Sequence, residues 1–474
     1  MIYSTPKEFQ VRLHHCRPRF KNNRENVLLF MASEVCFIGR QTQKEFKSKL
    51  NSSIRLFPGN TTKSDKTINN WRTEITNLLG LVQYFEDGTC GPSKLAVKLS
   101  ENQDLPEFFK YFCYYFQYPG GHLKPKSTIE MIQKGVLFKP ASYILKVLKS
   151  GRDIADKDFG INKAEATHCI FNDLRVVRDN LDPKEVSLLI IKNRRQRLSY
   201  DSSGDVIRYA GDILDYMVLA NLLIYRPNQR YYLNTVEFEL IEKFEKNESA
   251  FEEYAKFYKQ PNKLTLNEIN LTQNKWFDYV NQISDDFFET DILSILDQSK
   301  LNLKDEGSNI LYDFIADLKR KELKNINIKT KQIGDAGESI SIHHEKLRLE
   351  SIERPDLAKK VIKIPEAYAA GYDINSYEGV GEIKRCIEVK TTISKSKVNI
   401  TRFHMTPNEW GAAETYRDAY YIYRLLISTD GVDLFVIRNP VQKYKNDQLS
   451  MVPRNGVDIT YDNKSGEFEE LMVQ

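Results

Sequence analysis

Two short segments decide the fold of the C-terminal part of this chain: Gly371-Tyr-Asp-Ile-Asn-Ser376 and Lys384-Arg-Cys-Ile-Glu-Val-Lys-Thr-Thr-Ile393. Both alternate polar and apolar residues, which is the period of a β-strand. Glu388 and Lys390 therefore share one face of the second strand. Fourteen residues separate Asp373 from Glu388, and this is enough for a turn that lays the two strands side by side.

Asp373, Glu388 and Lys390 are the residues from which we predict a chemical function. Two carboxylates that point the same way from adjacent strands form a hard-oxygen site for one or two Mg²⁺ ions. A lysine two residues beyond the second carboxylate can orient or deprotonate a water, or stabilise charge that develops on phosphorus. These are the requirements of phosphodiester hydrolysis. The alternative is a half-exposed strand with a surface salt bridge, which accounts for Glu388 and Lys390 but not for the joint pattern.

The surrounding sequence predicts an α/β domain around a mixed sheet. A helix opens at Gly334–Glu338 and extends to about Glu350, and a short strand is expected at 361–364. After the two deciding strands, the capping box Thr406-Pro-Asn-Glu409 opens a further helix. Strands at 420–428 and 434–438 complete the order α-β-β-β-α-β.

This order, with the motifs Gly371-Tyr-Asp373 and Ile387-Glu-Val-Lys390, resembles the PD-(D/E)xK nuclease superfamily. Over about 110 residues, from Gly337-Glu338 to Tyr420–Tyr423, the chain is similar to the nuclease domain called NO VEIN C-terminal-like, which is fused to many restriction-type endonucleases. One departure is Tyr372, which replaces the proline before the first acid. The resemblance implies that Glu338 is a third, direct or water-mediated, metal ligand. The alternative is a carboxylate that is favoured by the helix dipole. Weaker candidates for the site are His343, His344, Thr391, Lys395, His404 and Glu409.

The first hundred residues predict three helices followed by a hairpin. The helices are expected at 25–38, from Thr42 to about Leu50, and at 66–79, and the hairpin at 81–92. This is the order of a winged helix, whose third helix enters the major groove and whose hairpin touches the backbone.

The same order recurs in a second module. Helices are predicted over 162–177, 182–198 and 205–219, and a hairpin over 222–233. Two copies of one architecture favour two winged helices, and a generic helical array with incidental hairpins is the alternative.

The charge distribution suggests which part contacts a phosphate-rich partner. Residues 1–100 carry 16 Lys and Arg against 8 Asp and Glu, a surplus of +8, whereas residues 331–474 carry 20 against 22, a balance of −2. We therefore expect the N-terminal part to bind DNA, although a surplus of this size also arises by chance on a solvated surface. The candidate DNA contacts are Arg17, Arg19, Lys66, Asn69, Asn70, Arg72, Arg194 and Arg195. For Arg194 and Arg195, a favourable position at a helix C-terminus is an equal alternative.

The length of 474 residues indicates a multidomain chain, mainly α at the N-terminus. We expect aromatic-rich packing helices over 100–150, and long connecting helices at 236–257 and 305–323. The Lys- and Asn-rich segment 319–331 is the best boundary. The predicted divisions are recognition module 1 at 1–150, recognition module 2 at 151–240, a helical connector at 241–330 and the nuclease domain at 331–474.

Other sequence features point to a cytoplasmic protein with no membrane association. No apolar run approaches about 20 residues, and the N-terminus lacks the apolar core of a signal peptide. The six cysteines are scattered without a C-x-x-C pair, which predicts reduced thiols and argues against a zinc site or a disulfide framework.

A basic recognition part joined to a metal-dependent nuclease part resembles a type II restriction endonuclease of type IIS layout. The resemblance implies Mg²⁺-dependent cleavage of double-stranded DNA. Because a single site cuts one strand, duplex cleavage would need a transient homodimer, two nicks or a second nuclease subunit. A separate cognate methyltransferase is expected. The alternatives are a strand-specific nicking enzyme, a modification-dependent defence nuclease and a non-catalytic DNA-binding regulator.

Overall fold

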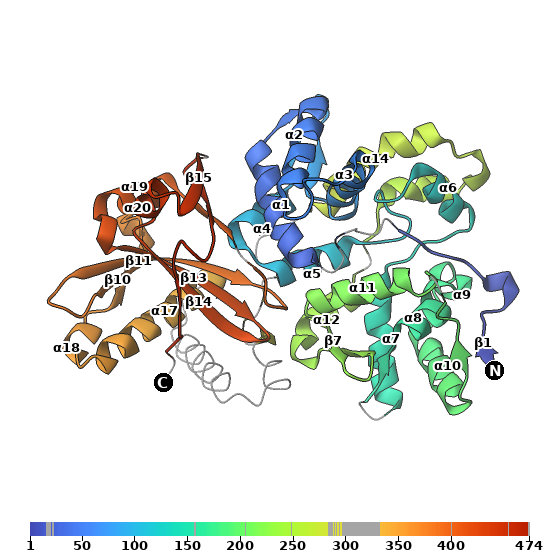
Figure 1. The fold of residues 1–474 in the computed structure, drawn as a ribbon. Helices are drawn as coiled ribbons and strands as arrows, with labels where there is room; N and C mark the ends of the chain where they lie inside the picture. The colour runs from blue at the N-terminus through green and yellow to red at the C-terminus, as the bar shows by residue number, and fades with distance from the viewer. Residues whose placement is uncertain are drawn as a thin grey trace. The chain divides into compact units, whose positions relative to one another are not determined.

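In the computed structural model the chain forms two compact units (Figure 1). The first comprises Met1–Ser100 and Leu105–Phe288, and the second comprises Glu101–Asp104 and Glu289–Gln474. The structure describes residues 1–15, 20, 23–155, 158–203, 205–247, 249–282, 288, 290, 292, 294–295, 332–399, 401–453 and 455–472. Arg17, Arg19, the helix predicted at 305–323 and the boundary predicted at 319–331 lie outside these residues.

The first module has the predicted order of three helices and a hairpin. It comprises α1 (Arg24–Ile38), α2 (Gln43–Leu56), α3 (Asp65–Thr73), β3 (Val82–Tyr84) and β4 (Thr89–Pro92). A two-residue strand that we did not predict, β2 (Gln41–Thr42), pairs with β4. Helix α2 is longer than predicted because Phe46, Leu50 and Ile54 continue one buried stripe at a spacing of four. Beyond α3 the helix predicted to Leu79 continues only as a π-helical turn, Glu74–Leu78.

The second module repeats this sheet with different helices. Its elements are β5 (Gly160–Ile161), α8 (Lys163–Ala166), α9 (Leu174–Val177), α10 (Pro183–Arg195), α11 (Arg208–Leu219), β7 (Leu223–Arg226) and β8 (Arg230–Leu233). The strand orders β2-β4-β3 and β5-β8-β7 correspond, because in each a two-residue strand pairs with the second strand of the hairpin. The prediction of a single helix over 162–177 is wrong. A π-helical turn, Thr167–Phe171, follows α8, and Asp173 caps the new helix α9 by accepting from the backbone N–H of Arg175.

Packing helices surround the two modules within the first unit. They are α4 (Lys94–Asn102), α5 (Leu105–Tyr115), α6 (Pro125–Gln133), α7 (Pro140–Ile154) and α14 (Leu266–Val280). The aromatic residues of α5 are core residues as predicted, since Phe108, Phe109 and Tyr111 are buried. The long helix predicted at 236–257 is instead two short helices, α12 (Phe238–Glu245) and α13 (Ala255–Tyr258). Between them the chain turns inward, and the Asn247 amide donates to the Tyr114 carbonyl.

A six-stranded mixed sheet forms the centre of the second unit (Figure 1). Its order is β17 (Glu467–Glu469), β14 (Gly431–Arg438), β13 (Tyr420–Ser428), β11 (Lys384–Ile393), β10 (Ile374–Tyr377) and β9 (Ile362–Lys363). Strands β11 and β13 are parallel and are joined through α19 (Pro407–Tyr416). The predicted order α-β-β-β-α-β is present, because α17 (Gln332–Ser351) precedes these strands. A second sheet of β12 (Arg402–Met405), β16 (Val457–Tyr461) and β15 (Leu449–Pro453) was not predicted, nor were α18 (Pro355–Ala358) and α20 (Pro440–Lys445).

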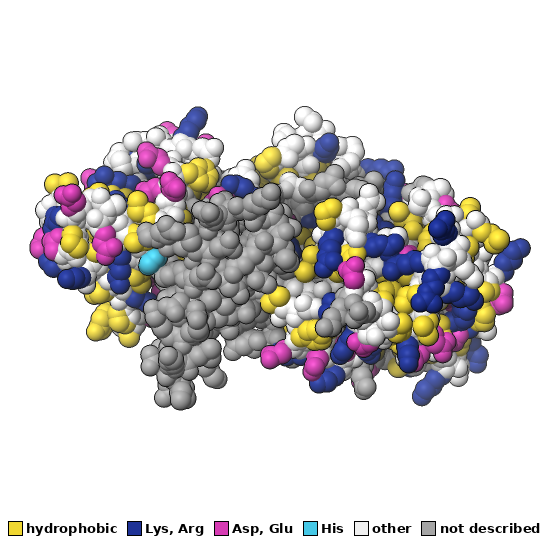
Figure 2. Space-filling model, turned by 90° about the horizontal axis from the view of Figure 1, so that it is seen from below, with side chains coloured by type: hydrophobic (Ala, Val, Ile, Leu, Met, Phe, Trp, Pro, Cys, Tyr) yellow, Lys and Arg dark blue, Asp and Glu magenta, His cyan; other side chains and the backbone are white. Residues whose placement is uncertain are grey.

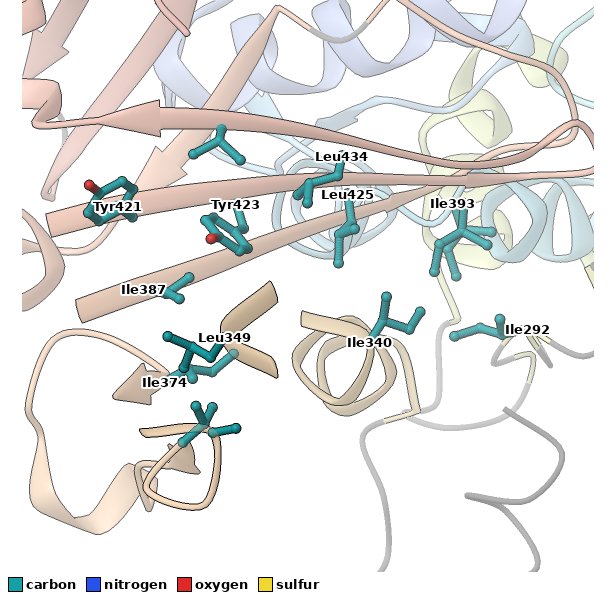
Figure 3. Packing of buried hydrophobic residues seen from close by; sticks show 14 of the residues in the cluster. Ile292, Ile340, Leu349, Ile374, Ile387, Ile393, Tyr421, Tyr423, Leu425 and Leu434 are labelled. Atoms are coloured by element: carbon teal, nitrogen blue, oxygen red, sulfur yellow. The ribbon is translucent and has the colours of Figure 1, made fainter. Parts of the chain in front are cut away.

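Both faces of the central strand β11 are covered. Ile340 and Leu349 of α17 pack against one face, with Ile387 of β11 and Tyr423 of β13 (Figure 3). On the other face Cys386 belongs to a second core with residues of α19, β12 and β16. The face that carries Glu388 and Lys390 is therefore a partly buried surface and not an open one.

None of the helices within the described residues combines the length and the apolar character that crossing a bilayer requires. Of the six cysteines, the five that the structure describes are buried and form no disulfide with one another: Cys36, Cys90, Cys113, Cys169 and Cys386.

Candidate functional site

The backbone around Asp373 is fixed from three sides. Gly371 has φ +75°, and a Cβ there would lie 2.6 Å from the carbonyl oxygen of Asn408 in α19. Glycine suits this position for two reasons. Other residues are strained at a positive φ, and glycine has no Cβ that would collide with α19. The hydroxyl of Tyr420 donates to the Gly371 carbonyl at 2.9 Å, and the N–H of Asp373 donates to the carbonyl of Ile387 at 2.9 Å. The Asp373 side chain is therefore presented from a rigid turn.

Asp373 lies at the bend just before β10, whose first residue, Ile374, pairs with Ile387 of the antiparallel strand β11. One carboxylate oxygen of Asp373 accepts a hydrogen bond from the backbone N–H of Val389 at 2.8 Å. Glu388 is buried, with 4 % of its surface exposed. The pairing of β10 with β11 therefore places Asp373 beside Val389, close enough to Glu388 for the two charges to interact.

Lys390 lies between two carboxylates. Its Nζ is 2.7 Å from Oε1 of Glu388 and 2.8 Å from Oε2 of Glu409. Glu409 also closes the capping box of α19, since its Oε2 accepts from the backbone N–H of Thr406 at 3.1 Å. Glu409 therefore contacts the helix cap and the lysine at the same time.

Glu338 projects from the first turns of α17 toward the edge strand β9. Its Oε2 lies 2.6 Å from Nζ of Lys363, and the same Nζ lies 2.6 Å from Oδ1 of Asp335. The helix comes very close to β11 here, because a Cβ on Gly337 would overlap the hydroxyl of Thr391. That hydroxyl is buried and has no hydrogen-bond partner among the described residues.

Burial and like charge dominate the electrostatics of this region. Burial raises the pKa of Asp373, although the hydrogen bond from Val389 opposes the change. Burial raises the pKa of Glu388 well above its usual value, and the negative charges of Asp373 and Glu409 add to this against the attraction of Lys390. Burial alone would lower the pKa of Lys390, but Glu388 and Glu409 together outweigh it and raise that pKa. Burial raises the pKa of Glu338 to about 7, opposed by the contact with Lys363.

The carboxylates fit a divalent cation as part of its coordination shell. Asp373, Glu388 and Glu409 place three acidic groups around one lysine, so the cluster is short of positive charge in a buried position. Within the described residues, no three His, Cys, Asp or Glu side chains converge closely enough to form a complete metal site. Asp373 and Glu388 would therefore supply two oxygens, and water and phosphate oxygens the others, as Mg²⁺ commonly requires.

Two of the weaker candidates, His344 and His404, make their contacts outside this cluster. His344 is buried and accepts from the backbone N–H of Met472 at 3.1 Å, with Glu469 3.4 Å from its other ring nitrogen. His404 contacts Asp458 at 2.8 Å in the second sheet. These contacts are structural, because they join one strand or helix to its neighbour.

Two residues of the site were missed by the sequence reasoning. Lys363 belongs to a two-residue strand whose pairing partner cannot be read from the sequence, although pairing with Ile374 brings it to the site. Tyr420 was assigned to a strand, but its hydroxyl orients the turn before Asp373. For Tyr420, the sequence signal is a tyrosine at the start of an otherwise apolar strand, and this does not indicate a contact with Gly371.

The candidate DNA contacts of the first unit fall into two groups. Lys66, Asn69 and Arg195 are exposed, and Asn70 is half-buried. Arg72 donates to Asn51 at 2.6 Å and to Asn69 at 2.8 Å. Arg194 is 2.8 Å from the buried carboxylate of Glu165, which also holds Arg230 at 2.9 Å. Arg194 therefore anchors the hairpin of the second module. Figure 2 shows Lys and Arg side chains gathered over one face of the first unit.

Family models match both parts of the chain. The model described as "Restriction endonuclease BpuJI - N terminal" matches residues 3–277. The model described as "Protein NO VEIN, C-terminal" matches residues 337–437, which confirms the resemblance drawn from the motifs of this region. A search of curated proteins finds no match.

Two solved structures are similar to parts of this chain to different degrees. One is the "Crystal structure of pyrene- and phenanthrene-modified DNA in complex with the BpuJ1 endonuclease binding domain", with 25% identity, a TM-score of 0.52 and coverage of 58% of this chain and 99% of that chain. A second, "Structure of restriction endonuclease FokI bound to DNA", has 12% identity and a TM-score of 0.20, with coverage of 83% and 81%. The second similarity is too weak to support any argument.

Proposed function

Because this chain belongs to the BpuJI N-terminal family of restriction endonucleases, we propose that it is a site-specific endonuclease that hydrolyses phosphodiester bonds in double-stranded DNA. The single observation that carries the proposal is the clustering of Asp373, at the bend before β10, with Glu388 and Lys390 of β11. A family match indicates a fold, whereas this arrangement of side chains indicates where hydrolysis would take place.

The first unit is proposed as the DNA-recognition part, with two winged-helix modules. The BpuJ1 binding domain, to which this unit is similar, is in complex with DNA in its crystal structure. The corresponding sheet topologies and the exposed positions of Lys66, Asn69 and Arg195 support this role. Recognition and cleavage in separate units amount to a type IIS layout, in which the cut lies beside the site that is read.

Hydrolysis is proposed to use the residues of the second unit. Mg²⁺, when bound, would activate the attacking water and neutralise charge on the phosphate. Asp373 and Glu388 would hold the ion, and the hydrogen bond from Val389 fixes the orientation of the first of these carboxylates. Lys390, an ammonium between two carboxylates, would stabilise the charge that develops on the phosphate oxygens. Glu409 keeps the lysine in place.

Further partners are part of the proposal. One such site cuts one strand, so a transient homodimer or a second nuclease subunit would complete a double-strand break. A separate methyltransferase would protect host DNA. A cytoplasmic location is part of the proposal, and thiols rather than disulfides at the five described cysteines are consistent with it.

Asp373→Asn and Lys390→Ala test the proposed function, with Lys384→Ala as the matched control. Lys384 lies on the same strand but is exposed at its beginning. Each chain is incubated with a mixed-sequence plasmid library and Mg²⁺, and the new DNA ends are sequenced. We expect discrete ends beside one shared motif for the wild type and the control. We expect at least a thousandfold slower cleavage for the two site variants, with DNA affinity unchanged. Cleavage by either variant at the wild-type rate would contradict the site.

The same library distinguishes the alternative functions. Ends that arise only on methylated DNA would indicate a modification-dependent nuclease, and single-strand breaks would indicate a nicking enzyme. DNA binding without any cleavage by the wild type would indicate a non-catalytic regulator. The presence of Asp373, Glu388 and Lys390 in one cluster favours the nuclease.

A further inference from the structure

Lys363 is held rigidly beside the acidic site. Strand β9 pairs with β10 through Lys363 and Ile374, and the backbone N–H of Ile364 donates to the carbonyl of Asp373 at 2.7 Å. The lysine therefore comes from the strand next to the one that follows Asp373. Its side chain is 43 % exposed, whereas that of Glu338 is 15 % exposed.

The ammonium of Lys363 is shared by two carboxylates of one helix. Asp335 and Glu338 stand three residues apart on α17, which places them on the same face. Both carboxylates have an oxygen 2.6 Å from Nζ. Asp335, Glu338 and Lys363 therefore form one ion-paired cluster, and the charge of Asp373 acts on Glu338 from outside it.

Without Lys363, Asp335 and Glu338 would be two neighbouring carboxylates of α17 with no neutralising cation. Their hard oxygens are the type of ligand that a divalent cation prefers, and water would complete its coordination. A second divalent ion and the lysine ammonium would compete for the same carboxylate oxygens and would repel each other.

We propose that Lys363 takes the place of a second divalent cation in this site. The chain then binds one divalent ion, at Asp373 and Glu388, and Glu338 is a positioning residue that holds Lys363 and is not a ligand. This inference rests on the proposed function and deepens it. In two-ion nucleases, two cations about 4 Å apart stabilise the attacking and the leaving oxygens. Here the ammonium of Lys363 would stand where the second of the two cations lies in those nucleases.

The test counts Mn²⁺ ions bound to the full chain without DNA, by the electron paramagnetic resonance signal of the free ion. The variants are Lys363→Met, Glu338→Gln and Asp373→Asn. Lys360→Met is the matched control, because Lys360 is an exposed lysine of the same segment that pairs with Glu382 at 2.7 Å. Circular dichroism verifies the fold of each variant.

We expect one ion per chain for the wild type and for Lys360→Met. Glu338→Gln should keep that ion with an affinity within about threefold, since Glu338 is not a ligand. Lys363→Met should bind two ions, and the double variant Lys363→Met/Glu338→Gln should return to one. The double variant keeps the test decisive, because it shares the lysine substitution but lacks the carboxylate.

Two ions in the wild type, or a tenfold loss of Mn²⁺ affinity in Glu338→Gln, would overturn the inference. One ion in Lys363→Met with unchanged affinity would also overturn it. These outcomes differ from a failure of the proposed function. If Asp373→Asn bound Mn²⁺ as the wild type does, the metal site itself would be wrong. If Asp373→Asn lost the ion while the wild type bound two, only the role of Lys363 would be wrong.

Discussion

Lys390 and Glu409 form an ion pair of 2.8 Å between a strand and the first turn of the helix that follows it. The oxygen that binds the lysine is the one that accepts from the N–H of Thr406 in the capping box. The position of the lysine therefore depends on the start of α19.

Substitutions at Glu409 and Thr406 separate these two roles. Gln at position 409 can still accept the capping hydrogen bond but cannot neutralise the ammonium. We expect Glu409→Gln to slow DNA cleavage at least tenfold with little loss of stability. Thr406→Ala removes the cap, so we expect a loss of about 1 kcal/mol in the free energy of unfolding and cleavage within threefold of wild type. Urea denaturation and a plasmid cleavage assay measure the two quantities. Equal effects of both variants on cleavage would contradict a separate role of the ion pair.

Gly371→Ala tests whether the close approach to α19 positions Asp373. A Cβ at this residue would lie 2.6 Å from the Asn408 carbonyl oxygen and 2.7 Å from the Ala412 Cβ. Gly381→Ala is the matched control, since Gly381 also has a positive φ, +60°, but has nothing within 4 Å of a Cβ. Both variants carry the cost of the backbone conformation, about 1 kcal/mol. We expect Gly371→Ala to lose a further 1–3 kcal/mol or so from overpacking and to lose cleavage. If Gly371→Ala and Gly381→Ala were equally stable in thermal denaturation, α19 would be able to move away from the added methyl group.

The buried carboxylate of Glu345 predicts a pH dependence of stability. Glu345 contacts Arg348 at 2.8 Å and Arg385 at 3.3 Å, and the hydroxyl of Ser376 donates to it at 2.6 Å. Although burial opposes ionisation, these partners lower the pKa of Glu345 from 4.5 to about 2. A pKa that is lower in the folded state gives stability that is present above the unfolded pKa and lost as pH falls from about 4.5 toward 2.

We expect Glu345→Gln to reduce the free energy of unfolding by about 3 kcal/mol at pH 7, with a smaller difference from the wild type at pH 4 and below. Urea denaturation at several pH values measures this difference in the free energy of unfolding. The matched control is Glu382→Gln, an exposed carboxylate paired with Lys360, for which we expect no comparable loss. A difference that does not change between pH 7 and pH 3 would contradict the assignment to this carboxylate.

Arg194 and Arg195 are adjacent at the end of α10 but should respond differently to substitution. Arg194→Ala leaves the buried carboxylate of Glu165 with fewer partners, so we expect a loss of stability of a few kcal/mol. Arg195 is exposed, so Arg195→Ala should leave the melting temperature unchanged. If Arg195 contacts a phosphate, its loss weakens DNA binding and reduces the salt slope by about 1. Fluorescence anisotropy at several salt concentrations measures this. An unchanged slope for Arg195→Ala would remove that residue from the interface.

The sequence alone determined part of the local structure of the second unit. The strand Lys384–Ile393, the cap at Thr406 and the pairing of β10 with β11 follow from residue periods and turn lengths over short stretches of chain. Such signals depend on backbone geometry and nearest neighbours, so they survive in any tertiary context.

Only the tertiary structure decided which charged groups meet. Lys363 and Glu338 are 25 residues apart and come together through strand pairing and helix packing, and Arg194 and Glu165 are 29 residues apart. The break in the helix predicted at 162–177, like the sheet of β12, β15 and β16, depends on packing that periodicity does not encode. The physical reason is that a charged side chain shows no preference for a distant partner in the sequence, and finds it only when the backbone has been placed.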